Sequence, residues 1–255
     1  MKPLILIGLA SLAIITPRAV SGAFDWPQWQ GPGRDGVSKE TGLLQEWPKD
    51  GPPLAWSVKG LGGGDSTPSV AAGRIYGMSH RGADEVVWAL SEKDGKEIWA
   101  VRIAPAHSQS WNQSKEGPAC TPTVDGNLLY VMGLAGNVVC LQAADGKVVW
   151  TRNLRTDFGG KSPMWSYRES PLVDGDKVIC TPGGDETTMV ALNRSSGATL
   201  WKTFVPDRGA AGGQTPNRPP APNMPNVMRM DPMLSSLDKD QNNEISAGGR
   251  ANVIL

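Results

Sequence analysis

The chain has 255 residues, of which 39% are hydrophobic, and 25 basic residues balance 25 acidic ones to a formal net charge of zero. This length suffices for one large domain or two ordinary ones with a packed core. Without a long basic run, no nucleic acid or anionic membrane surface is predicted as a partner. The 31 Gly, 21 Pro and 10 Trp residues are typical of short strands joined by tight turns, and two His residues leave little material for a His-based site.

The N-terminus carries Lys2, an apolar run over residues 4–16 and a small-residue pattern at residues 21–23. The run is too short to span a bilayer comfortably, and its end resembles a signal-peptidase cleavage site. We therefore predict that residues 1–23 are a secretory signal peptide. The mature protein is then exported, periplasmic or extracellular, with no membrane span after signal removal; a retained anchor is the alternative.

The cysteines are odd in number, which is unusual in an exported chain, and their spacing gives no CxxC metal site. At most one internal disulfide can form among Cys120, Cys140 and Cys180. The last two stand in the apolar runs VVCL and VIC, so we predict that they are small buried side chains.

A repeat of 51 residues organises the centre of the chain. In the segments DGKEIW, DGKVVW and SGATLW, a Gly stands four residues before a Trp. Each copy also contains a Ser/Thr-Pro pair, then Val and a Gly turn (STPSV, CTPTV, ESPLV), so the repeat is a whole supersecondary unit. The Gly and Trp pairs are Gly95 and Trp99, Gly146 and Trp150, and Gly197 and Trp201.

Short apolar runs in the first copy predict four antiparallel strands at about residues 68–71, 74–79, 86–91 and 96–102. No window has a sustained 3.6-residue apolar period, so helices are not expected in the repeats. Units of this size with four strands and a terminal Trp are typical of β-propeller blades. We therefore predict an all-β fold for residues 24–205, an incomplete β-propeller of about three four-stranded antiparallel blades.

The Gly and Trp of each copy have a structural interpretation in such a blade. Gly tolerates positive φ in the hairpin before the last strand, and a large Trp at the end of that strand can cover the edge between neighbouring blades. We interpret these tryptophans as packing residues between blades. A role as a cofactor platform is the alternative.

These residues point to a known family. The motif A-L-x-x-x-x-G-x-x-x-W, clearest from Ala191 to Trp201, resembles the tryptophan-docking repeat of the pyrroloquinoline quinone (PQQ)-like β-propellers. This superfamily includes quinoprotein alcohol dehydrogenases and the outer-membrane assembly scaffold BamB. Residues 25–56 are similar to the N-terminal segment of exported PQQ-like repeat proteins of planctomycete-type bacteria, and the resemblance covers about residues 25–205.

The resemblance is less specific for function than for fold. For the dehydrogenases it implies PQQ on the axis of a closed propeller, beside a calcium ion and an Asp base, often under two adjacent Cys. This sequence has no Cys-Cys pair, and no Asp matches the catalytic one. We therefore predict a binding or scaffold module without an identifiable catalytic site, and no PQQ held by this chain alone. The alternative is part of a PQQ-dependent quinoprotein oxidoreductase whose remaining blades are missing or supplied by another chain.

The small number of blades has three explanations, because closed members of the family usually carry seven or eight. Three blades leave two open sheet edges. The chain is truncated, several copies assemble as a homo-oligomer that closes the propeller, or the blades are capped by the chain's own termini. Truncation is the explanation that the apolar end ANVIL favours.

The C-terminal part changes composition abruptly. Residues 206–226 form a Pro/Gly-rich linker, and residues 227–255 resemble a short α-helical EF-hand-like calcium module. Gly249 replaces the usual Glu at loop position 12 and Asn243 the usual Gly at position 6, which predicts a weak calcium site or, alternatively, a degenerate loop. Loop positions 1, 3, 5, 7 and 9 are Asp238, Asp240, Asn242, Glu244 and Ser246.

Aromatic residues in the long segments between blades are the remaining candidates. Loops on one face of a rigid scaffold often bind partners, so we predict that Trp111, Trp165, Tyr167 and Arg168 face a protein or glycan partner. Packing across the blade junction is the alternative for them.

Overall fold

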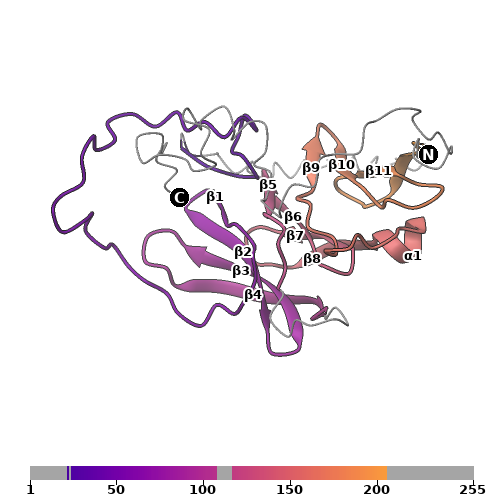
Figure 1. Ribbon diagram of the computed structural model, residues 1–255, viewed down its shortest axis with the longest axis horizontal. Helices are drawn as coiled ribbons and strands as arrows, with labels where there is room; N and C mark the ends of the chain where they lie inside the picture. Colours follow the sequence, from indigo (N-terminus) through magenta and orange to yellow (C-terminus); the bar gives the residue numbers. More distant parts are fainter. Residues whose placement is uncertain (1–21, 23, 108–116, 206–255) are drawn as a thin grey trace, which may run out of the picture. The chain divides into compact units, whose positions relative to one another are not determined.

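The computed structural model describes residues 22, 24–107 and 117–205 (Figure 1). The chain divides into two units, Met1–Pro206 and Asp207–Leu255, and all described residues belong to the first. The predicted signal peptide, linker and EF-hand-like loop lie outside the described residues. No helix in the described part is long and apolar enough to cross a membrane.

Three four-stranded antiparallel sheets make up the described fold, and each has its strands in sequence order. The first sheet contains β1 (Ser69–Ala71), β2 (Arg74–Arg81), β3 (Asp84–Ser91) and β4 (Glu97–Pro105). The second contains β5 (Thr123–Asp125), β6 (Leu128–Met132), β7 (Asn137–Gln142) and β8 (Val148–Asn153). The third contains β9 (Leu172–Asp174), β10 (Lys177–Cys180), β11 (Met189–Asn193) and β12 (Thr199–Thr203). The prediction of an all-β fold with three four-stranded blades is confirmed.

The second sheet lies between the other two (Figure 1), and its first strand, β5, contacts both β1 and β9. Its strands β6 and β7 are almost completely buried, because side chains on both faces of the sheet are covered by neighbours. The predicted burial of Cys140 and Cys180 is confirmed, and all three cysteines are free thiols. The continuous core therefore runs through the sheet junctions.

One short helix was not predicted. After β8 the chain forms α1 (Leu154–Phe158), and the side chain of Asn153 accepts hydrogen bonds from two backbone N–H groups of its first turn. Gly159 ends the helix in the left-handed conformation. Leu154 and Phe158, four residues apart, are both buried, so capping and one apolar face suffice without a longer 3.6-residue period.

The motif tryptophans build the junctions between sheets. Trp99, at the outer strand of the first sheet, donates from Nε1 to the carbonyl of Ala143 at 3.2 Å. Its ring lies on Gly146 in the second sheet, where a Cβ atom would stand 2.7 Å from the ring. Gly146 has φ +74°, so the position requires Gly both for its backbone conformation and for the contact.

The same contact recurs at two more places. In each, an indole Nε1 donates to a carbonyl three residues before a positive-φ Gly, and the ring covers that Gly. The donor, acceptor and covered residues are Trp150, Arg194 and Gly197 at the second junction, and Trp56, Glu92 and Gly95 ahead of the first sheet. The interpretation of these tryptophans as packing residues between blades therefore holds for Trp99 and Trp150.

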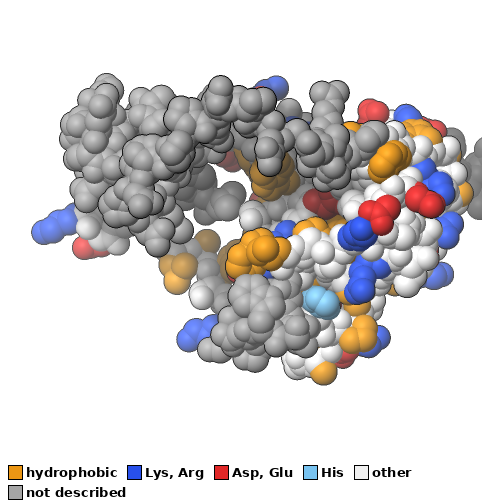
Figure 2. Space-filling view, turned by 45° about the vertical axis from the view of Figure 1, so that its right-hand side comes forward, with side chains coloured by type: hydrophobic (Ala, Val, Ile, Leu, Met, Phe, Trp, Pro, Cys, Tyr) orange, Lys and Arg blue, Asp and Glu red, His pale blue; other side chains and the backbone are white. Residues whose placement is uncertain are grey.

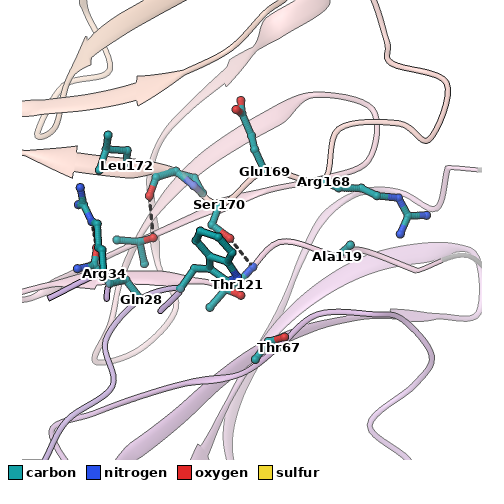
Figure 3. Close-up of a pocket in the computed structure, with 12 residues that line it drawn as sticks. Gln28, Arg34, Thr67, Ala119, Thr121, Arg168, Glu169, Ser170 and Leu172 are labelled. Atoms are coloured by element: carbon teal, nitrogen blue, oxygen red, sulfur yellow. Dashed lines mark hydrogen bonds between the residues drawn. The ribbon is translucent and has the colours of Figure 1, made fainter. Parts of the chain in front are cut away.

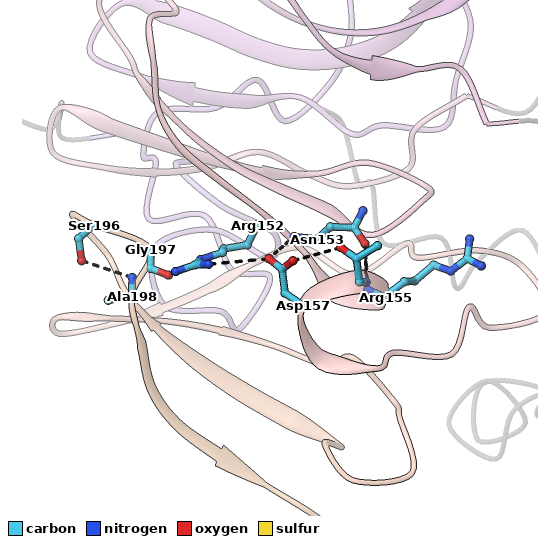
Figure 4. Close-up of polar contacts among 8 residues, drawn as sticks. Arg152, Asn153, Arg155, Asp157, Ser196, Gly197 and Ala198 are labelled. Carbon is cyan, nitrogen blue, oxygen red and sulfur yellow. Dashed lines mark hydrogen bonds and ion pairs between the residues drawn. The ribbon is translucent and has the colours of Figure 1, made fainter.

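A polar contact reinforces the second junction (Figure 4). Arg152, two residues after Trp150, donates from Nε to the carbonyl of Gly197 at 2.8 Å. Its guanidinium also lies 3.9 Å from the carboxylate of Asp157 in α1. The unpredicted helix thus orients an arginine that holds the third sheet.

Candidate functional site

The N-terminal segment crosses the first strands of all three sheets, and we call residues 26–36 the crossing segment. Trp26 forms a β-bridge with the first sheet. The carbonyl of Pro27 accepts from a backbone N–H of the second sheet at 2.8 Å, and Arg34 Nη2 donates to a carbonyl of the third at 2.8 Å. The three partners occupy one repeat position and are Val70, Val124 and Val173.

The crossing segment is folded tightly on itself. Gly31, at φ +77°, lies against the ring of Trp26, where a Cβ atom would be 2.8 Å from it. Arg34 Nε donates to Gln28 Oε1 at 3.1 Å, and the N–H of Gly36 donates to the carbonyl of Gln30 at 3.0 Å. These turns fix Arg34 where it reaches the third sheet.

Hydroxyl groups lie beside this segment where β5 and β9 begin (Figure 3). The N–H of Thr121 donates to Ser170 Oγ at 2.9 Å, and Thr123 Oγ1 donates to the carbonyl of Pro171 at 2.7 Å. Both bonds join the second sheet to the third. The Ser/Thr-Pro pairs of the repeat therefore link neighbouring sheets near their first strands.

A cavity of about 560 Å³ opens between the crossing segment and these strand starts. The sheets position its walls rigidly, because the strand starts are hydrogen-bonded to one another. Its lining includes Trp29, Arg34, Thr67, Thr121, Arg168 and Ser170. Hydroxyl groups, guanidinium groups and one indole suit a ligand with hydrogen-bond acceptors and an apolar surface.

The two arginines stand at opposite ends of the cavity (Figure 3) and have protein partners. Arg168 pairs with Asp65 at 3.0 Å and donates from Nε to the carbonyl of Trp165 at 2.6 Å. Arg34 is held by the crossing segment and β9. At the same rim, Glu169 accepts from the N–H of Thr181 at 2.7 Å. The charged groups are thus pre-oriented before any ligand arrives.

The structure separates the predicted partner-facing residues. Trp165 is 54% exposed on the loop that leads to Arg168 at the cavity. Tyr167 corrects the prediction: it is 2% exposed and donates from its hydroxyl to the carbonyl of Pro182 at 3.0 Å. Its ring packs against Gly136, and this close contact requires Gly because a Cβ atom there would stand 2.9 Å from the ring. Trp111 and the calcium-loop residues 238–246 lie outside the described residues.

Glu85 is a buried carboxyl that the sequence prediction missed. It is 1% exposed at the junction of the first two sheets. Its Oε1 accepts from the N–H of Leu134 at 3.2 Å, while Oε2 faces Gly133 and has no hydrogen-bond partner among the described residues. Burial raises the pKa of Glu85 to about 7, and the Leu134 bond offsets part of that rise. The sequence signal that could have identified this buried carboxyl is the position of Glu85 directly before the apolar run VVWAL.

Surface charge is mixed. Figure 2 shows one face of the molecule, on which basic and acidic side chains are interspersed with separate apolar ones. Among the described residues, no group of three His, Cys, Asp or Glu side chains could hold a metal ion. We therefore derive no step through calcium or PQQ.

Three sheets joined by docked tryptophans define the class of tryptophan-docked β-propeller repeat proteins. A family model described as "Outer membrane protein assembly factor BamB" matches residues 83–223, more than half of the chain. The chain belongs to this family.

The relatives include outer membrane protein assembly factors and quinoprotein dehydrogenases. The chain is 27% identical over 140 residues to the BamB protein of Salmonella typhimurium and 33% identical over 140 residues to that of Escherichia coli. Each match covers 54% of this chain and 31% of the relative. The quinoprotein ethanol dehydrogenase of Pseudomonas aeruginosa is 29% identical over 110 residues, which cover 43% of this chain and 17% of the relative.

A solved structure supports the fold. The quinohemoprotein alcohol dehydrogenase from Comamonas testosteroni matches with a TM-score of 0.52 and 23% identity over 71% of this chain and 27% of that chain. The chain thus spans about a third or less of the length of these relatives. Their activities and partners do not transfer to it directly.

Proposed function

We propose that this chain is a binding or scaffold module that holds a protein segment at the cavity beside the crossing segment. The observation that carries the proposal is an exposed Trp in the wall of a cavity whose arginines already have fixed partners, with a second exposed Trp on the loop that leads to Arg168. Trp29, in the cavity lining, is 56% exposed, and Trp165, whose carbonyl accepts a hydrogen bond from Arg168, is 54% exposed. Aromatic residues, Met and Arg are enriched at protein interfaces, and Arg168 supplies the guanidinium here.

The partner that fits this site is a protein segment with apolar anchors and backbone or side-chain oxygens. Tryptophan rings offer large apolar contact area at low cost in conformational entropy. The lining hydroxyl groups and arginines donate hydrogen bonds to the oxygens. The similarity to BamB, an outer membrane protein assembly factor by its description, supports a protein over a glycan.

A capture experiment tests this function. The full chain is cross-linked in the envelope of its own cells, and the captured proteins are identified by mass spectrometry for wild type, Trp29→Ala and Trp165→Ala. Trp47→Ala is the matched control, because Trp47 is 53% exposed but neither lines the cavity nor contacts Arg168 as Trp165 does. We expect one set of partners to be lost in the first two variants and kept in the control. Equal capture by all four chains would contradict the proposal.

The enzymatic alternative draws on the quinoprotein relatives. A chain that retains PQQ absorbance after titration with PQQ and calcium and subsequent desalting would support it. Loss of all absorbance would leave the binding function as the better account.

Export and calcium binding complete the proposal. The apolar N-terminus and the similarity to outer membrane assembly factors support a location outside the cytoplasm. Acidic and amide side chains at alternate positions from Asp238 support weak calcium binding by the C-terminal segment. Calorimetric titration of the full chain and of Asp238→Ala with calcium distinguishes a real loop from a degenerate one.

A further inference from the structure

The docking contact follows one geometry at the three places where it occurs within the described residues. The indole Nε1 donates to the carbonyl three residues before the covered Gly at 3.0 Å for Trp56, 3.2 Å for Trp99 and 2.9 Å for Trp150. A donor Trp therefore requires a hairpin with a positive-φ Gly and a free carbonyl at fixed spacing. The contact thus has two halves, a donor Trp and an acceptor hairpin.

The third sheet presents a donor Trp that meets no hairpin among the described residues. Trp201 pairs with Ala191 in the register that Trp150 forms with Cys140, so its strand has the same conformation. It is nevertheless 37% exposed, and within the described residues its Nε1 forms no hydrogen bond. All five residues of β12 are exposed, and Phe204 continues the apolar edge at 50% exposure.

The opposite end of the array presents a hairpin whose Trp comes from outside any sheet. Trp56 belongs to a stretch without strand pairing, residues 52–59, yet it covers Gly95 as a strand residue would. Val58 adds a contact to Gly95, as Val101 does to Gly146 at the first junction. The Gly95 hairpin is therefore complementary to Trp201. The residues that cover it now, 52–59, are held by few backbone hydrogen bonds.

We infer that Trp201 docks on the Gly95 hairpin of a second copy of this chain and displaces the Trp56 of that copy. The contact is heterologous, with different surfaces on the two copies, so it repeats head to tail and adds three sheets with each copy. It buries the apolar edge of β12. It rests on the junction geometry and does not depend on the proposed function of the cavity.

Displacement makes a specific prediction, because Trp56 and the incoming Trp201 compete for one hairpin. The mass of the full chain is measured by light scattering across a concentration series. We expect wild type to rise above its single-chain mass and Trp201→Ala to remain at it. We expect Trp56→Ala, with its hairpin vacated, to associate at a concentration at least about tenfold lower. Trp47→Ala, which removes a Trp that is 53% exposed and lies outside the proposed binding site, should behave as wild type.

Other outcomes overturn the inference. Association of Trp201→Ala at the wild-type concentration would show that another surface joins the copies. A Trp56→Ala chain that associates no more readily than wild type would show that the hairpin is not the receptor, provided that its circular dichroism shows intact sheets. If that variant loses its sheets, Trp56→Phe, which keeps an aromatic ring but lacks the indole N–H, is used instead and must also lower the association concentration.

Discussion

The second and third sheets carry the same motif in different surroundings. Trp150 and Trp201 occupy equivalent positions and pair with the third strand in the same register, but Trp150 is 8% exposed and Trp201 37%. The difference lies in the neighbour, since Trp150 meets the Gly197 hairpin and Trp201 meets no described hairpin. The burial of a motif Trp is therefore decided by the repeat that follows it.

The largest expected effect comes from removing a covered Trp. Trp150→Ala removes a buried indole, its hydrogen bond to Arg194 and its cover of Gly197. We expect it to lower the free energy of unfolding by about 3–5 kcal/mol, as for other large-to-small core substitutions. Trp201→Ala is the matched control, with an expected loss below about 1 kcal/mol, since its ring is exposed. Urea denaturation measures both, and equal losses would refute the comparison.

Glu85, at the junction of the first and second sheets, makes the free energy of unfolding depend on pH. Its pKa is raised above that of an unfolded Glu, so between about pH 4.5 and pH 7 the unfolded chain releases this proton and the folded chain keeps it. This group then favours folding at low pH, and its contribution is lost as pH rises to about 7, by about 3 kcal/mol in all. Glu85→Gln should lack this loss. Denaturation of both chains at pH 5 and pH 8 tests it, and parallel pH dependence would contradict the burial of Glu85.

A comparison of two glycines with similar left-handed backbones separates the cost of backbone strain from the cost of contact with a tryptophan ring. Gly146 and Gly126 have φ of +74° and +62°, but of the two only Gly146 lies under a tryptophan, and no atom of the described residues is within 4 Å of a Cβ placed on Gly126. We expect Gly126→Ala to cost about 1 kcal/mol from the left-handed backbone alone. Gly146→Ala should cost about 2 kcal/mol, because Trp99 must also move. Melting temperatures that fall equally would show that the contact adds nothing.

The smallest expected effect concerns the crossing segment. Arg34→Ala removes the bond to Val173 and the bond to Gln28, which should lower the free energy of unfolding by about 1 kcal/mol. The exposed Lys59→Ala is the control. Faster amide exchange in β9 with unchanged exchange in β1 would locate the effect at the third sheet, and uniform change would contradict the role of the crossing segment.

Much of the fold could be predicted from the repeat. Apolar runs bounded by Gly turns located the four strands of the first sheet to within a few residues, because each strand is short and buried on a regular pattern. The helix α1 was missed because one apolar pair, Leu154 and Phe158, does not form a period. The crossing segment was missed because its partners lie far along the chain, Arg34 and Val173 being 139 residues apart.

The site was predicted only in part. Trp165 and Arg168 were identified as loop residues, and both lie at or beside the cavity in the structure. Tyr167 could not be separated from them by sequence, since its burial depends on Gly136 of another sheet. Trp29 and Arg34 line the cavity through folding of the crossing segment, which no periodic pattern reveals.

Hydrogen–deuterium exchange of the backbone amides in β8 and β12 tests the central claim most directly, with the chain kept dilute. The two strands have the same motif and pair with their sheets in the same register. If the following repeat determines the stability of a blade edge, the amides of β8 exchange only on global unfolding, and those of β12 exchange faster by local opening. Equal protection of both strands would contradict the account, because the motif alone would then stabilise the edge.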